Sequence, residues 1–246
     1  MVFTALELAA IMPDASKIES DEPEMESSLH YLQLSLLVAC LEWLWRDRNN
    51  FFIGANLTVY YSEQQLRNRD FRGPDFFLVR NAQKRPRRSW VVWQEDGKYP
   101  DVIIELLSES TAKVDRNAKK ILYQDRFRTP EYFWFDPEDL ELAGFRLISQ
   151  EYQPIVANES GKLWSDVLEL YLGIHDGKLR YFSQDGELVP TPEEAALQAK
   201  QETKEAKQET KEAQQQAEQA KQQAEQAQQR ADRLADQLRT LGIEPE

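Results

Sequence analysis

The spacing of apolar side chains changes along this chain, and each change marks an expected element. Residues 24–47 repeat apolar side chains in steps of three and four, which predicts an amphipathic helix capped by Ser27 or Ser28. The apolar face expected for this helix consists of Leu29, Leu32, Leu36, Cys40, Trp43 and Leu44. From Phe51 onward the period falls to two, which is typical of strands.

Strands are predicted where apolar, β-branched and aromatic residues gather between loops that contain Gly, Pro and charge. These segments are FFIGANLTVYY (51–61), PDFFLV (74–79), SWVVWQ (89–94), DVIIELL (101–107), EYFWFDP (131–137), ELAGFRLI (141–148) and YQPIVA (152–157). A second helix is expected over residues 112–126, with Thr111 as its cap. Residues 157–190 predict a short helical piece followed by a hairpin. This order indicates an α/β core with a mixed sheet.

The C-terminal part holds a single heptad period from Ala196 to Leu241. Its consecutive repeats are KQETKEA, KQETKEA, QQQAEQA, KQQAEQA, QQRADRL and ADQLRTL. This period predicts a coiled coil, through which we expect the chain to form a homo-oligomer. Most positions along the seam are alanine and bury little area, so the alternative is a lone solvated helix of high intrinsic propensity.

The expected organisation is an N-terminal segment over 1–22, a folded domain over 23–190 and the heptad-repeat tail over 193–242.

The chain has 246 residues and a formal net charge of −13, which argues against strong nonspecific binding of nucleic acid but permits a local basic face. Cys40 is the only cysteine, so an intrachain disulfide and a cysteine zinc site are excluded. Without a basic n-region or a run of ~18 apolar residues, we expect a soluble, cytoplasmic protein and no membrane partner.

Two carboxylates lie in or beside strands that should be buried, Asp75 before FFLV and Glu105 within VIIELL. A buried carboxylate is costly unless it is paired or holds a metal. If the two strands are neighbours, Asp75 and Glu105 can share one divalent cation, and their hard oxygen ligands favour Mg²⁺ or Mn²⁺ over zinc. Asp101 lies four residues before Glu105 on the same strand, about 13 Å away along the backbone, and is not expected to join them.

The second helix brings Asp115, Lys119 and Tyr123 onto one face, because they recur at four-residue steps. Hydrolysis of a phosphodiester needs a positive charge for the water nucleophile or the developing oxyanion, and Lys119 is the candidate. Lys120 should point elsewhere. The alternative is an exposed ion pair between Asp115 and Lys119 without a catalytic role.

A basic segment precedes the Glu105 strand and could contact nucleic acid. Its cations are Arg80, Lys84, Arg85, Arg87 and Arg88, with Arg67, Arg69 and Arg72 before Asp75. Lys84, Arg85, Arg87 and Arg88 would neutralise phosphates, and the indoles of Trp90 and Trp93 would stack on bases. The alternative is a solvated hairpin tip whose tryptophans belong to the core.

The order of these motifs resembles the Uma-type putative restriction endonuclease family of the PD-(D/E)xK nuclease superfamily. The matching features are Pro74-Asp75, the strand glutamate Glu105, a Ser-x-Ser-Thr segment, the helical Asp/Lys/Tyr set and a Tyr-x-Trp-x-Asp-Pro segment. They extend from about Glu22 to Leu147. The combined order is far more specific than the Pro-Asp dipeptides Pro74-Asp75 and Pro100-Asp101 alone.

The resemblance implies a restriction-endonuclease-like core, with a mixed central sheet flanked by helices, and a metal-dependent endonuclease acting on DNA. Asp75 and Glu105 would then be the metal ligands. Leu107 stands where the superfamily has its lysine, so Lys119 would supply that group from the helix. Asp115 and Tyr123 would be accessory residues. Glu26 would add a further carboxylate, although it also suits the first turn of a helix as a partner of the dipole.

A rival hypothesis from another class is a catalytically inactive nuclease fold that serves as a scaffold, with the coiled-coil tail mediating assembly with other proteins. Leu107 and the acidic balance favour it, whereas the basic residues 84–88 and the retained set of Asp75, Glu105 and Lys119 oppose it. Geometry discriminates between the two, because hydrolysis requires the two carboxylates to be adjacent and Lys119 to face them.

Overall fold

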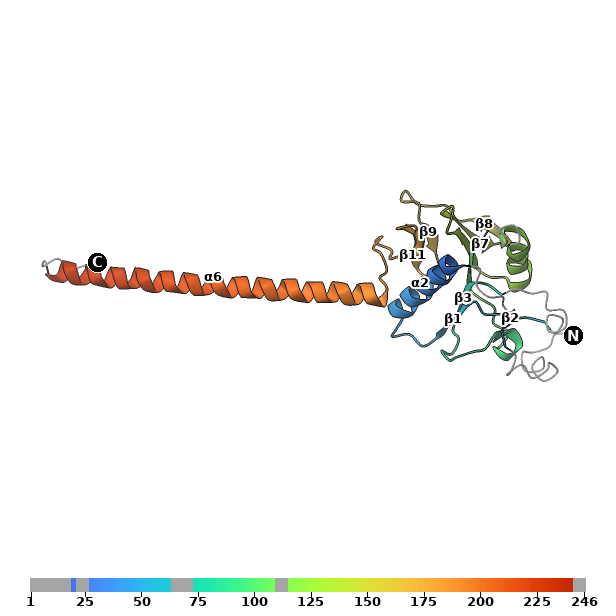
Figure 1. The fold of residues 1–246 in the computed structure, drawn as a ribbon, viewed down its shortest axis with the longest axis horizontal. Coiled ribbons are helices and arrows are strands. Elements are labelled where there is room, and N and C mark those ends of the chain that lie inside the picture. The colour runs from blue at the N-terminus through green and yellow to red at the C-terminus, as the bar shows by residue number, and fades with distance from the viewer. Residues whose placement is uncertain (1–18, 21–26, 63–72, 109–114, 241–246) are drawn as a thin grey trace. The chain divides into compact units, whose positions relative to one another are not determined.

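The structure is a computed structural model that describes residues 19–20, 27–62, 73–108 and 115–240. The chain divides into two units, Met1–Pro192 and Glu193–Glu246, and each is considered by itself. The first unit is a mixed α/β domain and the second is a long helix, α6 (Figure 1).

The domain is built on a six-stranded sheet with the order β1-β3-β5-β6-β7-β8. Its strands are β1 (Phe51–Ala55), β3 (Phe76–Arg80), β5 (Val102–Leu106), β6 (Glu131–Asp136), β7 (Glu141–Ile148) and β8 (Glu151–Pro154). Neighbours pair antiparallel except β5 and β6, which are parallel. A parallel pair needs a crossover, which here contains the helical segment Asp115–Phe127. The predicted mixed sheet is therefore confirmed.

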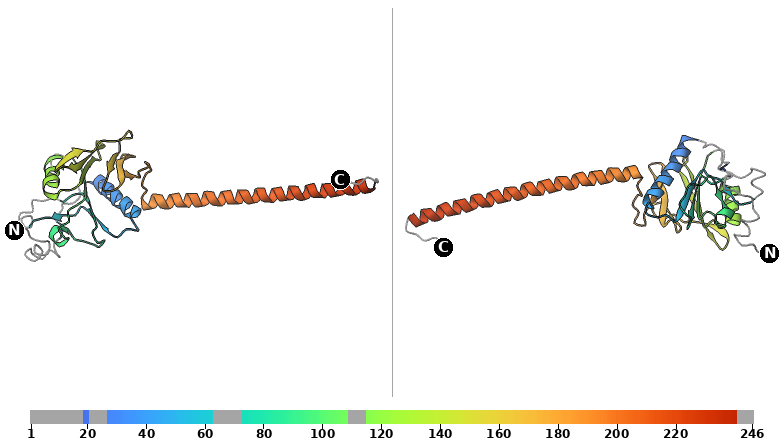
Figure 2. Two further views of the ribbon diagram at one scale, coloured as in Figure 1. Left: turned by 180° about the vertical axis from the view of Figure 1, so that it is seen from behind. Right: turned by 90° about the horizontal axis from the view of Figure 1, so that it is seen from below.

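One face of this sheet is covered by α2 (Ser28–Leu44) and by a three-stranded sheet of β9 (Leu163–Ser165), β10 (Leu170–His175) and β11 (Lys178–Phe182). Figure 2 shows α2, in blue, beside β11, against which it packs. Alternate residues of the central strands point to this face, among them Phe76, Leu78 and Ile104.

The opposite face is covered by the crossover and by a short parallel pair, β2 (Val59–Tyr60) and β4 (Trp90–Val91), which is followed by η1 (Val92–Gln94). The intervening residues of the same strands, Phe77, Val79 and Ile103, point this way. Each central strand is thus apolar on both sides, which explains the near-continuous hydrophobic runs in the sequence.

The crossover confirms the predicted second helix over the residues that the structure describes. It consists of η2 (Asp115–Lys119) and η3 (Tyr123–Phe127), both wound as π-helix, around α5 (Lys120–Leu122). The segment ends at Arg128, which adopts a left-handed conformation with φ 57°. Thr111, the expected cap, lies outside the described residues.

The apolar face predicted for α2 is wrong except at Cys40, which is buried, and Leu36, which packs against the core, whereas the helix and its cap at Ser27 are confirmed. The side chains of Leu29 and Leu32 are 50% and 58% exposed, whereas Leu34, Leu37 and Leu41 are buried. The buried face also carries two polar residues, His30 and Gln33, which made it the less apolar stripe in the sequence. Gln33 is satisfied there because its amide both donates to and accepts from the backbone of Leu179, at 2.9 and 3.0 Å.

The short helical piece expected after residue 157 is also wrong, because Leu163–Ser165 form β9 and the chain then turns. The hairpin is confirmed as β10 and β11, with its turn at Asp176 and Gly177.

The second unit is α6 (Pro192–Thr240), a helix of 49 residues. Polar side chains one turn apart support it, as when the amide of Gln208 donates to Glu212 at 2.6 Å and that of Gln228 to Asp232 at 2.9 Å. Among the described residues, no helix is long and apolar enough to cross a membrane.

Candidate active site

Asp75 and Glu105 lie side by side at one end of the central sheet. The register of β3 and β5 pairs Phe76 with Ile104, so Asp75, just before β3, stands opposite Glu105. The backbone N–H of Asp75 donates to Oε2 of Glu105 at 3.3 Å, and the N–H of Leu106 donates to Oδ2 of Asp75 at 2.7 Å. Each carboxylate is therefore held by the strand that carries the other.

The carboxylate of Glu105 is fully buried and is compensated by two donors from the crossover. The Tyr123 hydroxyl donates to Oε1 at 2.6 Å, and Nζ of Lys119 lies 3.0 Å from Oε2. The Lys119 side chain is 12% exposed, so little water screens this ion pair. The structure thus brings together Asp75, Glu105, Lys119 and Tyr123, which lie on three separate segments of the chain.

Leu107, at the position of the superfamily lysine, is a core residue. Its side chain is fully buried in the cluster that contains Tyr123 and Val59. Its carbonyl oxygen accepts a hydrogen bond from Nε2 of His30 at 3.0 Å, and Nδ1 of His30 bonds to the Ser27 hydroxyl at 2.9 Å. His30 thereby ties the start of α2 to the end of β5, which is a structural role.

Asp101 lies at the other end of β5, apart from the site, as the strand geometry predicted. Its carboxylate binds Arg80, accepting from the backbone N–H at 2.7 Å and from the guanidinium at 3.1 and 3.3 Å. This contact joins the far ends of β3 and β5.

A family model named Uma2, with the description "Putative restriction endonuclease", matches residues 14–176. The chain belongs to the Uma2 family. The match includes the segments that carry Asp75, Glu105, Lys119 and Tyr123, and it ends before α6. The family resemblance expected from the order of the motifs is confirmed.

A crystal structure of a putative nuclease belonging to DUF820 from Anabaena variabilis is similar to this Uma2 chain. The two share 17% sequence identity with a TM-score of 0.46, and the similarity covers 72% of this chain and 97% of that one. No curated protein matches the chain.

Two of the accessory residues expected for a Uma2 site cannot be placed. Glu26 lies outside the described residues, and so does the side chain of Asp115, although its backbone begins η2. Lys120 points away from Glu105, as predicted, because its Nζ lies 3.3 Å from the ring centroid of Phe145. Burial against that ring lowers the pKa of Lys120.

Sequence reasoning missed Arg116, which lies beside this site. Its guanidinium is 4.6 Å from the ring centroid of Trp134, and Trp134 is the partner of Glu105 in the register of β5 and β6. The available signal was its spacing, since a residue three before Lys119 lies on the same side of a helix.

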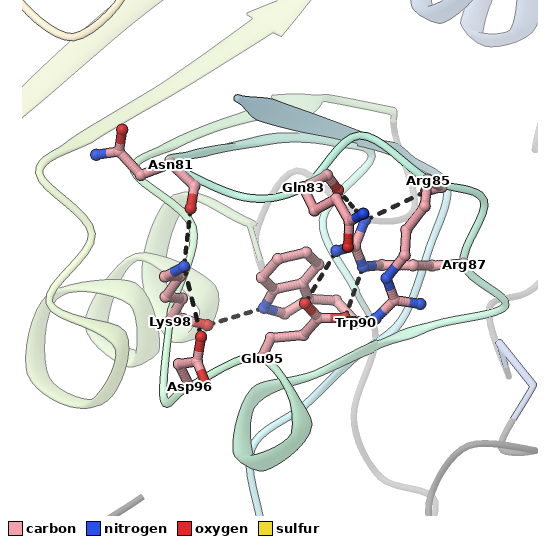
Figure 3. Close-up of polar contacts among 8 residues, drawn as sticks. All are labelled: Asn81, Gln83, Arg85, Arg87, Trp90, Glu95, Asp96 and Lys98. Carbon is pink, nitrogen blue, oxygen red and sulfur yellow. Dashed lines mark hydrogen bonds and ion pairs between the residues drawn. The ribbon is translucent and has the colours of Figure 1, made fainter. Parts of the chain in front are cut away.

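The basic segment of this Uma2 chain is largely paired with acids. The guanidinium groups of Arg85 and Arg87 converge on Glu95, and Arg87, whose side chain is only 2% exposed, lies against the Trp90 ring (Figure 3). Lys84 pairs with Glu42 and Arg88 with Glu19.

The tryptophans of this segment are core residues rather than a platform for bases. Trp90 is fully buried and Trp93 nearly so, and the indole N–H of Trp90 donates to the carbonyl oxygen of Lys98 at 2.8 Å. Of the two alternatives for these tryptophans, the one that assigns them to the core is therefore confirmed, and stacking of nucleic acid on the indoles is wrong because both rings are buried. The contact of DNA with Lys84, Arg85, Arg87 and Arg88 stays a prediction.

The residues at the site suit a hard divalent cation. Among the described residues, no group of three or more His, Cys, Asp or Glu side chains is placed to hold a metal ion. The candidate ligands are the adjacent carboxylates of Asp75 and Glu105. Their donors are all oxygen, and together with Lys119 the group carries one net negative charge. Mg²⁺ is typically held by one or two carboxylates and completes its shell with water and substrate phosphate.

Proposed function

We propose that this protein is a divalent-metal-dependent endonuclease that hydrolyses phosphodiester bonds of DNA. The observation that carries the proposal is the convergence of Asp75, Glu105 and Lys119, even though Leu107 fills the usual position of the lysine. Membership of the Uma2 family supports the same conclusion.

Asp75 and Glu105 would hold Mg²⁺ or Mn²⁺, which supplies charge neutralisation at the phosphate and acidifies a water ligand. Hydrolysis forms a bond from the water oxygen to phosphorus and breaks one phosphorus–oxygen ester bond, and a proton from the water ends on the departing ester oxygen, which leaves as an alcohol. Negative charge develops on the phosphate oxygens during this exchange. Lys119, whose Nζ lies 3.0 Å from Oε2 of Glu105, would position the attacking water and stabilise that charge. Tyr123 orients the carboxylate of Glu105 through its hydrogen bond to Oε1.

Plasmid nicking tests the proposal directly. Wild-type protein should convert supercoiled to open-circular DNA with Mg²⁺ or Mn²⁺ and not in EDTA. Asp75→Ala should lower the rate by about a hundredfold or more, because several kcal/mol of charge stabilisation are lost with the cation. Asp101→Ala is the matched control, since Asp101 is also an aspartate that joins β3 to β5 but lies at their far ends. Cutting that persists in EDTA, or that survives Asp75→Ala, excludes the proposed site.

We further propose that α6 pairs two copies of the chain, which suits cutting both strands of a duplex. Supporting this, one pair of positions that flank the alanine seam carries complementary charges. In a parallel pair, Glu202 of one helix would face Lys207 of the second copy. The scaffold hypothesis relies on the same helix, whose heptads lie outside the family match, and it differs in predicting no metal-dependent cutting.

Deleting residues 191–246 should lower the oligomeric state, measured by light scattering, and leave the circular dichroism melting curve of the domain cooperative. Leu234→Asp should act in the same direction, because Leu234 lies on the seam and is 59% exposed in the single chain. Leu197→Asp is its control, since Leu197 is 68% exposed on the same helix but lies off the seam. An unchanged mass after the deletion would contradict self-association through α6.

A further inference from the structure

Arg116 is a second cation that the crossover presents at the candidate site. It lies three residues before Lys119 in η2, and its guanidinium stacks on Trp134. Trp134 and Glu105 are register partners on β6 and β5, so their side chains lie on the same face of the sheet. Arg116 therefore covers the strand position next to the buried carboxylate.

The guanidinium of Arg116 is held in place and only partly shielded from solvent. Its Nε is buried and has no hydrogen-bond partner among the described residues, while NH2 donates to Oε2 of Glu141 at 2.7 Å. The side chains of Arg116 and Glu141 are 38% and 53% exposed, and an ion pair this exposed contributes little to stability. Stacking on Trp134 thus orients the planar guanidinium of Arg116. Among the described residues its only acidic partner is Glu141, and that ion pair is weak.

The net charge expected at the site favours a further cationic side chain such as Arg116. With a divalent cation bound, Asp75, Glu105 and Lys119 together carry one net positive charge, which the phosphate being cut would neutralise. The neighbouring phosphates of a DNA strand each bring a further negative charge to the same region. An arginine fork binds a phosphate through two parallel hydrogen bonds and so fixes its position, which a lysine does less well.

We propose that Arg116 binds a backbone phosphate of the DNA strand being cut, beside the scissile one, and exchanges Glu141 for that phosphate on binding. This assignment rests on the proposed nuclease function and names a DNA-positioning residue for it. It also gives Trp134 a role as the surface that orients the guanidinium.

The test measures affinity for a fluorescently labelled duplex by anisotropy in Ca²⁺ at several salt concentrations, together with nicking in Mg²⁺. The logarithm of the association constant falls as the logarithm of the salt concentration rises. Arg116→Ala should make this slope shallower by about 0.9, the value for one lost phosphate contact on duplex DNA. It should raise KM more than it lowers kcat. Arg116→Lys should keep the wild-type slope at intermediate affinity. Arg126→Ala is the control, because Arg126 also lies over an aromatic ring, that of Tyr61, at the other end of the segment.

Glu141→Gln separates binding from a structural role. If Arg116 acts on phosphate, removing its competitor leaves DNA affinity unchanged or higher. If the ion pair only maintains the fold, Glu141→Gln reproduces the effect of Arg116→Ala, and the inference is overturned. An unchanged salt slope in Arg116→Ala overturns it as well. A reduced slope in a protein that never nicks DNA would retain the phosphate contact and reject the nuclease proposal, and a wild-type protein that does not bind the duplex would reject both.

Discussion

Replacing Glu105 by glutamine should reduce metal-dependent nicking by about a hundredfold or more, a loss of roughly 2.7 kcal/mol of transition-state stabilisation. The amide keeps the shape of the side chain and can still accept a hydrogen bond from Tyr123, so the protein should remain folded. The charge that would hold the cation is lost, and Lys119 loses its counter-ion in a place where it is only 12% exposed. Initial rates over a range of Mg²⁺ concentrations and a thermal melt measure the two effects.

Tyr123→Phe should reduce nicking less than Glu105→Gln does. It removes the hydroxyl that donates to Oε1 of Glu105 and leaves the charge of the site unchanged. Loss of a hydrogen bond to a charged group costs about 1.5–3 kcal/mol, and only part of that should appear in the rate, since the carboxylate remains. Tyr123→Phe should therefore be more active than Glu105→Gln. Equal losses of nicking rate in the two variants would indicate that the orientation of the Glu105 side chain, and not its charge, limits the reaction.

Glu131→Ala should be the most destabilising of these substitutions, by about 3–5 kcal/mol, because it leaves several buried donors without an acceptor and removes one of the two acidic partners of Arg146. The carboxylate of Glu131 is 1% exposed and accepts from Nε of Arg146 at 3.0 Å, from the N–H groups of Asp166 and Val167 at 2.9 and 3.4 Å, and from the Ser165 hydroxyl. It thus joins β6 to the turn after β9, between the two sheets.

In a domain of this size each kcal/mol corresponds to about 2–4 °C, so Glu131→Ala should lower Tm by roughly 10 °C. Glu141→Ala is the matched control on the neighbouring strand. Its carboxylate is 53% exposed, and surface substitutions usually change stability by less than about 0.5 kcal/mol. Similar melting temperatures for the two variants would show that the buried network is not what holds β9 against the central sheet.

The two faces of α2 illustrate where pattern reading reaches its limit. Leucines occur so often in this helix that more than one stripe satisfies the helical period, and the stripe with Leu29 and Leu32 has fewer polar residues. The buried stripe instead contains His30 and Gln33, whose polar atoms are satisfied by the backbone of Leu107 and Leu179. Those acceptors lie far away in the sequence, so no local pattern could indicate that burial would cost little.

The basic segment shows that local sequence patterns also fail to predict which charged side chains are free to bind a ligand. Five cations near Trp90 predict a surface for phosphates, yet Arg87 is buried against that ring and shares Glu95 with Arg85. The cost of burying a guanidinium depends on whether a carboxylate and an aromatic face come together in space. A count of charges along the chain does not contain that information.

Local sequence patterns alone were enough to predict the strands of the central sheet, the crossover helix, the long C-terminal helix and the two carboxylates in or beside strands, because each reflects residues close together in the chain. The strand predicted over 89–94 is wrong beyond Val91, because Val92–Gln94 form the 3-10 helix η1. The order of those motifs also identified the family. The structure alone decided that β3 and β5 are neighbours in the register that sets Asp75 against Glu105. It likewise decided that the crossover carries Lys119 to Glu105 in place of Leu107, and Arg116 to Trp134. These contacts depend on strand register and on how a helix packs across a sheet, and both are determined by the whole core rather than by any one segment.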